Sequence, residues 1–125
     1  MNKKQTVFDL GKREREIFAA VLKLGEASVN DVLNELAAPP NYSTVRTILG
    51  QLVRKGTLTY RQDGVRYVYK ALTTKESAQK SAVRNIVSTL FYGKASDAVV
   101  AILDVAGSSL TEEEIEQIQR KINDR

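Results

Sequence analysis

The chain has 125 residues and a formal net charge of +4, which suits one compact domain or a small domain with an appended helical segment. It contains no cysteine and no histidine, which excludes disulfides and thiolate metal sites and removes the usual general base, so we expect no enzyme, no metal and no cofactor. No apolar run approaches the roughly 18 residues of a membrane span and no signal peptide opens the chain, so we expect a cytoplasmic protein without membrane insertion.

The first elements in the chain are expected to be helices. Residues 1–9 form a polar start that we expect to fray. Apolar residues at helical spacing predict a helix over 12–24. Ser28 and Asp31 have the spacing of a capping box that opens a second helix, and Pro39-Pro40 stops it. The third helix must therefore start at a sharp corner, which is the helix-turn-helix arrangement.

The third helix is predicted over residues 41–56, where Asn41 serves as N-cap and Gly56 as the left-handed residue after the end. Its apolar stripe consists of Val45, Ile48, Leu49 and Leu52. Its other face carries small, hydrogen-bonding or cationic residues and no acid: Ser43, Thr44, Arg46, Thr47, Gly50, Gln51 and Arg54. An ordinary amphipathic surface helix is the alternative, although such a surface tends to include Glu and Asp. The pattern favours a helix that enters a DNA major groove.

A β-hairpin is predicted directly after this helix, because the apolar period changes from 3.6 to 2. Its turn contains Asp63-Gly64, a strong hairpin signal. Arg61 and Arg66 are placed near its tip, where they would reach phosphates or the minor groove, as the wing of a winged helix does. The alternative is a hairpin that only covers the core through Tyr60 and Tyr67, and the two roles are compatible.

Three helices are predicted in the C-terminal part. A capping box at Thr73 to Glu76 opens the fourth helix, which extends to about residue 92. The fifth helix, residues 96–105, is apolar on nearly every side and must be buried all round. A second capping box, Thr111 to Glu114, opens the last helix, which extends to about residue 123.

These three helices span about 50 residues, too few to bury the fifth helix by themselves. A second copy of the segment is the simplest partner, and folding back onto the N-terminal part is the alternative. We therefore predict a homodimer. The residues predicted to form the dimer contact are Ile86, Leu90, Val99, Ile102, Leu103, Ile115 and Ile118.

The fold class predicted from these elements is mainly α with a small sheet: a winged helix-turn-helix followed by three helices. We predict a DNA-binding domain over residues 1–71 and a helical dimerisation domain over 72–125. The charge agrees with this division. Residues 1–70 hold 12 Lys/Arg against 7 Asp/Glu, whereas residues 71–125 hold 7 against 8. A basic half beside a near-neutral half suggests a polyanion-binding module joined to a protein-contact module.

Several of these stretches resemble one known family. Asn41-Tyr-Ser-Thr-Val-Arg-Thr, Leu52-Val-Arg-Lys-Gly, Gly64-Val-Arg-Tyr-Val-Tyr, Phe91-Tyr-Gly and Leu110-Thr-Glu-Glu-Glu-Ile are similar to the penicillinase-repressor family of bacterial winged-helix regulators, which includes the BlaI, MecI and CopY proteins. The resemblance covers about residues 11–124. It implies a homodimer that binds a palindromic DNA operator and represses transcription, with antibiotic resistance or copper transport as the regulated process.

The resemblance also implies how repression would be relieved. Copper-responsive members bind metal through cysteines, which this chain lacks, so that branch is excluded. Antibiotic-responsive members are cleaved at an Asn-Phe pair in the fifth helix, which implies a membrane-bound sensor protease as a partner. The matching positions here are Ala101 and Ile102, a different pair, so an inducing signal other than cleavage is the alternative. A competing hypothesis is a winged-helix protein-interaction module without specific DNA binding, but such a module has no reason to keep an acid-free recognition face.

Overall fold

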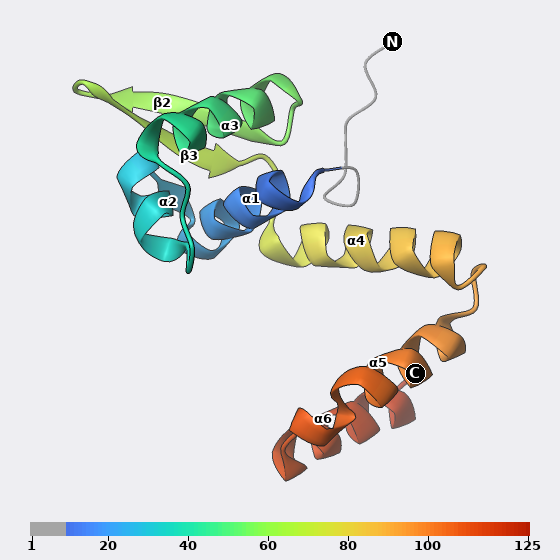
Figure 1. Ribbon diagram of the computed structural model, residues 1–125. Coiled ribbons are helices and arrows are strands. Elements are labelled where there is room, and N and C mark those ends of the chain that lie inside the picture. Colours follow the sequence, from blue (N-terminus) through green and yellow to red (C-terminus); the bar gives the residue numbers. More distant parts are fainter. Residues whose placement is uncertain (1–9) are drawn as a thin grey trace. The chain divides into compact units, whose positions relative to one another are not determined.

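The computed structural model describes residues 10–125, so the frayed start expected for residues 1–9 lies outside the described residues. The elements follow one another as α1 (Lys12–Leu24), β1 (Glu26–Ala27), α2 (Val29–Glu35), α3 (Tyr42–Arg54), β2 (Leu58–Asp63), β3 (Arg66–Ala71), α4 (Lys75–Leu90), α5 (Ala95–Ala106), a 3-10 turn (Gly107–Ser109) and α6 (Glu112–Asn123) (Figure 1). The predicted class, mainly α with a winged helix, is confirmed.

Contacts divide the chain into two compact units, one ending at Asn85 and the other spanning Ile86–Arg125. The fourth helix crosses this division. The domain boundary that the sequence places after residue 71 concerns function, and it stays a prediction. Among the described residues, no single helix is long and apolar enough to span a membrane. Within the described part of the chain, α4 and the segment Ala95–Ser109 reach the required length and hydropathy only when they are counted together across the break between them.

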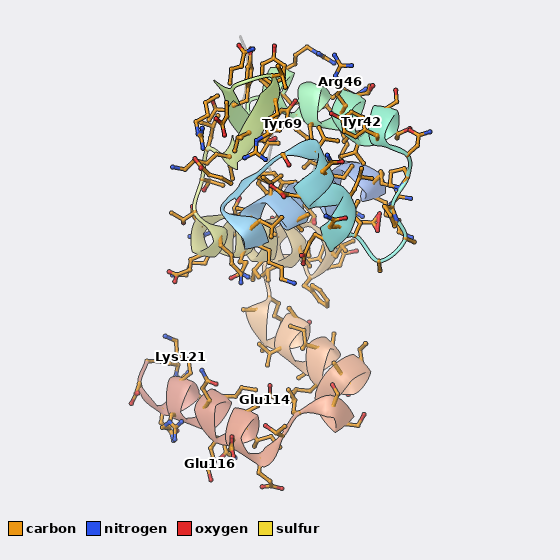
Figure 2. All side chains as sticks on the ribbon, turned by 90° about the vertical axis from the view of Figure 1, so that its left-hand side faces the viewer. Tyr42, Arg46, Tyr69, Glu114, Glu116 and Lys121 are labelled. Carbon is orange, nitrogen blue, oxygen red and sulfur yellow. The ribbon has the colours of Figure 1, made fainter. Side chains whose placement is uncertain are left out.

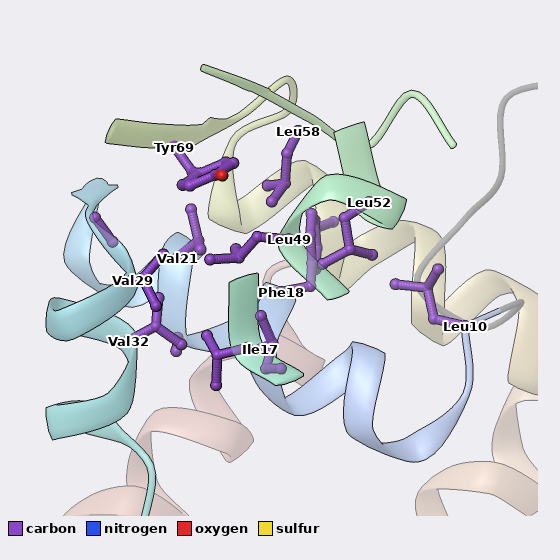
Figure 3. Packing of buried hydrophobic residues seen from close by; sticks show 14 residues of the cluster. Leu10, Ile17, Phe18, Val21, Val29, Val32, Leu49, Leu52, Leu58 and Tyr69 are labelled. Atoms are coloured by element: carbon purple, nitrogen blue, oxygen red, sulfur yellow. The ribbon is translucent and has the colours of Figure 1, made fainter. Parts of the chain in front are cut away.

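The core of the first unit is formed by α1, α2, α3 and one face of the sheet. Ile17 and Phe18 of α1 meet Leu49 and Leu52 of α3, and all four side chains are fully buried (Figure 3). Burial of each such side chain contributes roughly 1.5–3 kcal/mol. Tyr69 of β3 closes the core from the sheet side. The helix-turn-helix is thus held by its apolar faces, and its polar faces stay outside.

The sheet has three antiparallel strands in the order β1-β3-β2. The predicted hairpin is confirmed, and its turn uses Gly64 with a positive φ of 66°, which glycine adopts without strain. The strand β1 was not predicted. It has only two residues, Glu26 and Ala27, which pair with Lys70 and Tyr69 of β3. Two residues show no alternation, so no sequence pattern marks them.

The predicted caps are mostly confirmed. Asp31 donates its backbone N–H to Ser28 Oγ at 3.2 Å, and Ser28 N–H donates to Asp31 Oδ2 at 2.9 Å. This backbone hydrogen bond from Ser28 lowers the pKa of Asp31. The capping box predicted at Thr73 is wrong by one residue, because α4 begins at Lys75 and Ser77 N–H donates to Thr74 Oγ1 at 3.0 Å.

The second unit has very little interior of its own. Within Ile86–Arg125 only Ala98 is buried. The capping box of α6 is confirmed, since Glu114 N–H donates to Thr111 Oγ1 at 3.1 Å and Thr111 N–H donates to Glu114 Oε1 at 2.8 Å. The apolar side chains of α5 lie between 44% and 86% exposed from Val99 to Val105, alanine excepted. In a single chain, therefore, α5 is not buried all round.

Candidate nucleic-acid interface

The third helix begins and ends where its sequence predicts. Thr44 N–H donates to the Asn41 side-chain oxygen at 2.8 Å, which satisfies one free donor of the first turn. The helix buries Val45, Leu49 and Leu52 completely. At 100° per residue these three side chains share one face, so the opposite face of α3 is left to solvent.

That outer face carries all six of the α3 residues predicted to contact DNA. Five of them are exposed and one is half-buried: Ser43, Thr44, Arg46, Thr47 and Arg54, with Gln51 the half-buried one. The whole of α3, from Tyr42 to Arg54, contains no Asp or Glu. A protein surface that offers hydroxyls, an amide and guanidinium groups without any carboxylate is attractive to a polyanion.

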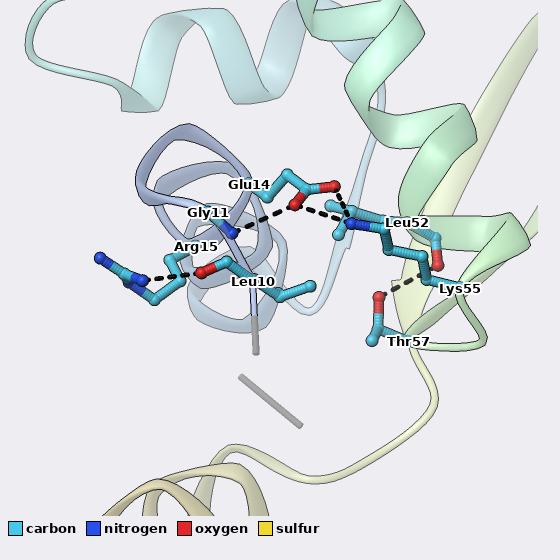
Figure 4. Close-up of polar contacts among 7 residues, drawn as sticks. All are labelled: Leu10, Gly11, Glu14, Arg15, Leu52, Lys55 and Thr57. Atoms are coloured by element: carbon cyan, nitrogen blue, oxygen red, sulfur yellow. Dashed lines mark hydrogen bonds and ion pairs between the residues drawn. The ribbon is translucent and has the colours of Figure 1, made fainter. Parts of the chain in front are cut away.

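The C-terminal end of α3 is fixed to α1 by an ion pair (Figure 4). Lys55 Nζ donates to both carboxylate oxygens of Glu14, at 2.9 and 2.8 Å, and Glu14 also accepts from Gly11 N–H at 3.2 Å. The hydrogen bond from Lys55 lowers the pKa of Glu14. Next to it, Thr57 Oγ1 donates to Leu52 C=O at 3.0 Å. Lys55 therefore anchors the end of α3 to α1. Its sequence position near the helix end did not predict this ion pair.

At the other end of the outer face, Arg46 lies near the tyrosines of the hairpin. Figure 2 labels Tyr42 and Arg46 on α3 and Tyr69 on β3. Burial raises the pKa of Tyr69, and the positive charge of Arg46 opposes that rise. Tyr60 stands edge-to-face with Tyr67, with ring centroids 5.1 Å apart. Tyr60 also lies against Tyr69, with ring centroids 6.1 Å apart, so the three rings pack together on one face of the hairpin.

The hairpin places its tyrosines and its arginines differently. Tyr60 pairs with Tyr69, and Arg61 pairs with Val68, so Arg61 lies on the sheet face opposite to Tyr60. Arg61 is in the middle of β2 and is not at the tip. Arg66 is the first residue of β3, directly after the turn, and it faces its cross-strand partner Asp63.

Both wing arginines are paired with carboxylates. Arg61 Nη2 donates to Glu26 Oε1 at 3.1 Å, and Arg66 Nη2 donates to Asp63 Oδ2 at 3.3 Å. All four side chains are about half exposed, so solvent screens these pairs. Sequence reasoning missed Glu26 because β1 was not predicted, and it also missed Lys70, which lies beside Glu26 in the register.

The second unit carries a different kind of surface. All seven residues predicted to form a dimer contact are apolar and exposed in the single chain, at 37% to 66%: Ile86, Leu90, Val99, Ile102, Leu103, Ile115 and Ile118. Large apolar surfaces of this kind mark contact sites. The predicted cleavage pair, Ala101 and Ile102, lies inside α5.

No group of three or more Asp or Glu side chains in residues 10–125 is arranged to hold a metal ion.

A helix-turn-helix followed by a basic hairpin, with an acid-free outer face on its third helix, defines a winged-helix DNA-binding regulator. A family model described as "Penicillinase repressor" matches residues 10–124. The chain therefore belongs to the penicillinase repressor family, whose members are transcriptional repressors and not enzymes. The resemblance seen in the sequence is confirmed.

Individual relatives are distant. The chain is 20% identical over 118 residues to the methicillin resistance regulatory protein MecI of Staphylococcus aureus strain N315, covering 93% of this chain and 94% of MecI. It is 28% identical over 109 residues to an uncharacterized 16.5 kDa protein of Latilactobacillus sakei, covering 86% of this chain and 73% of that protein. The oxidized form of MarR from E. coli matches with a TM-score of 0.53 and 11% identity over 93% of this chain and 75% of MarR, which shows the fold alone.

Proposed function

We propose that this protein represses transcription in the cytoplasm by binding a double-stranded DNA operator through α3 and the wing. The observation that carries the proposal is the outer face of α3, which is exposed, cationic and free of carboxylates while the inner face is fully used by the core. The major groove of B-DNA admits an α-helix held in this way.

The residues of α3 would contact different parts of the DNA, according to their position along the helix. Arg46 and Thr47 lie in the first half of the helix and would meet base edges, where an arginine recognises guanine with two hydrogen bonds. Ser43 and Thr44 stand at the helix N-terminus, which favours phosphate. Arg54, near the other end, would contact the sugar–phosphate backbone, and Gln51 completes the face.

The wing would add contacts that carry no sequence information. Arg61 and Arg66 would bind phosphates, each exchanging a carboxylate for the DNA strand. Because the carboxylates Glu26 and Asp63 compete with phosphate, the wing is less attractive to DNA than its arginine count suggests. Base contacts by α3 would then decide more of the binding.

The second unit supports a homodimer. A unit of this size with one buried side chain does not hide enough apolar surface to be stable alone. A second copy would cover the same seven residues on both chains, as a two-fold interface requires. Two DNA-binding units related by two-fold symmetry would fit a palindromic operator.

Relief of repression would act on this contact. MecI is by name a regulator of methicillin resistance, and we propose antibiotic resistance genes as targets of this protein too. A membrane-bound sensor protease would cut near Ala101 and Ile102, and a different inducing signal acting on the same contact is the alternative, because this pair is not the family's Asn-Phe. That cut would divide α5, weaken the dimer and release DNA by linkage, with no change at α3.

Arg46→Ala tests the DNA-reading role. Binding of both proteins is measured to a duplex from the region upstream of the protein's own gene and to a random-sequence duplex of equal length. We expect a loss of roughly 1–3 kcal/mol on the upstream duplex and a much smaller loss on the random one. Equal losses would make Arg46 a phosphate contact. A wild-type protein that binds neither duplex would overturn the proposal in favour of an interaction module.

A further inference from the structure

One glycine of this chain is required neither by a positive φ nor by a helix end. All seven glycines lie within the described residues 10–125. Four of them have a positive φ, and two others are at helix ends: Gly25, Gly56, Gly64 and Gly93 in the first group, Gly11 and Gly107 in the second. Gly50 belongs to neither group. It lies inside α3, where its backbone is ordinary helix.

The structure has room for a side chain at Gly50. A Cβ built there would meet only Arg54 Nη1, at 3.6 Å, which is an ordinary van der Waals distance to the end of a flexible side chain. The helix packs by the face of Val45, Leu49 and Leu52, which points the other way. A glycine inside a helix is less favourable than alanine, because it loses more backbone freedom on folding. No contact within the protein offsets this loss of helix stability at Gly50.

The position of Gly50 on the helix indicates a role outside the protein's own fold. It follows Ser43 by seven residues and Thr47 by three, and it precedes Arg54 by four, so these four residues form the outermost stripe of α3. Along this stripe the hydroxyls of Ser43 and Thr47 precede Gly50 and the guanidinium of Arg54 follows it, so Gly50 is the one position of the stripe without a side chain of its own.

We propose that Gly50 is a DNA-contact position, where the missing side chain lets the backbone of α3 lie directly against the sugar–phosphate wall of the major groove. The inference rests on the proposed function and deepens it. A side chain here would hold the helix off the duplex and weaken the contacts of its neighbours Arg46, Thr47 and Arg54 together. In the unbound protein the Arg54 guanidinium lies over Gly50, and it would move aside to the phosphate when DNA binds.

The test uses Gly50→Ala and Gly50→Leu in the full-length protein. Both substitutions introduce good helix formers, so the thermal unfolding midpoint should rise or stay unchanged. Affinity for the duplex from upstream of the protein's own gene should fall by roughly tenfold for alanine and by more for leucine. A variant that is at least as stable yet binds worse separates a contact role from a structural one.

Two results would overturn the inference. One is an alanine variant that binds the upstream duplex as tightly as the wild type does. The other is a lowered unfolding midpoint, which would show that the fold itself needs the glycine. Wild-type protein is measured first on both the upstream and the random duplex. If it binds neither, the proposed function fails and this inference fails with it, whereas tight wild-type binding with a neutral Gly50→Ala rejects the inference alone.

Discussion

The guanidinium of Arg61 and the carboxylate of Glu26 lie 3.1 Å apart, although β3 separates their two strands in the sheet. The hydrogen bond between them lowers the pKa of Glu26 and raises the pKa of Arg61, so both groups are more firmly charged than they would be alone. An arginine proposed to bind phosphate is thus already occupied by an anion of the same chain.

Glu26→Gln should strengthen DNA binding, because the amide holds Arg61 far less than a carboxylate does and leaves it to phosphate. We expect affinity to rise a few-fold, by about the same factor on the upstream and the random duplex, since phosphate contacts carry no sequence information. Glu35→Gln is the matched control, because Glu35 pairs with Lys23 between α1 and α2 and not with the wing. Unchanged affinity for Glu26→Gln would show that Arg61 does not reach DNA.

Arg66→Ala should weaken binding to all sequences alike. Removal of one phosphate contact reduces the slope of log affinity against log salt by about one unit. Lys23→Ala removes the same charge from α1 and should leave the slope unchanged. An unaltered slope for Arg66→Ala would place this arginine away from the duplex.

Glu14→Gln should destabilise the protein by about 1 kcal/mol at neutral pH, because it removes the charge that Lys55 holds and keeps the acceptor for Gly11. The folded pKa of Glu14 lies below its ordinary value of 4.5, so this stabilisation is present above pH 4.5 and is lost as pH falls through the folded pKa. Urea unfolding of both proteins at about pH 7 and pH 3 checks the sign. Glu16→Gln, which alters the exposed pair with Arg13, is the control and should have little effect at either pH. If the difference in unfolding free energy between wild type and Glu14→Gln persists at low pH, the charge of Glu14 is not what stabilises the protein.

Ile102→Asp should abolish the dimer. An unpaired carboxylate in an apolar contact costs several kcal/mol, so association should weaken by about 100-fold or more. Sedimentation at micromolar concentration measures the change, and Ser96→Asp on the same helix controls for charge alone. The first unit should stay folded, while binding to the upstream duplex falls with the dimer. A wild-type protein that sediments as a monomer would refute the proposed assembly.

The sequence predicted the elements whose signals are local. The ends of α1 and α3, the Asp63-Gly64 turn and the capping boxes at Ser28 and Thr111 depend on residues within one helical turn of each other, and all are confirmed. The error at α4 has the same local origin. Thr73 and Thr74 are adjacent and chemically equal as caps, and spacing alone favoured the wrong one.

Relationships between distant residues were not predictable in the same way. Glu14 and Lys55 are 41 residues apart, and Glu26 and Arg61 are 35 apart. Each pair forms only because helix packing or strand order brings its members together, and no spacing in the sequence indicates it. The stripe around Gly50 was visible in the sequence. Only the structure shows that the fold has room for a side chain there.

The single buried side chain of the second unit has a consequence for control by abundance. In the proposed homodimer a second copy supplies the missing interior, so this segment is fully packed only in the paired form. Occupancy of an operator by such a pair rises with the square of the free chain concentration when most chains are single. Halving the supply of protein would then leave about a quarter of the paired form, so a modest fall in synthesis would open the regulated genes sharply, without any chemical change to the protein.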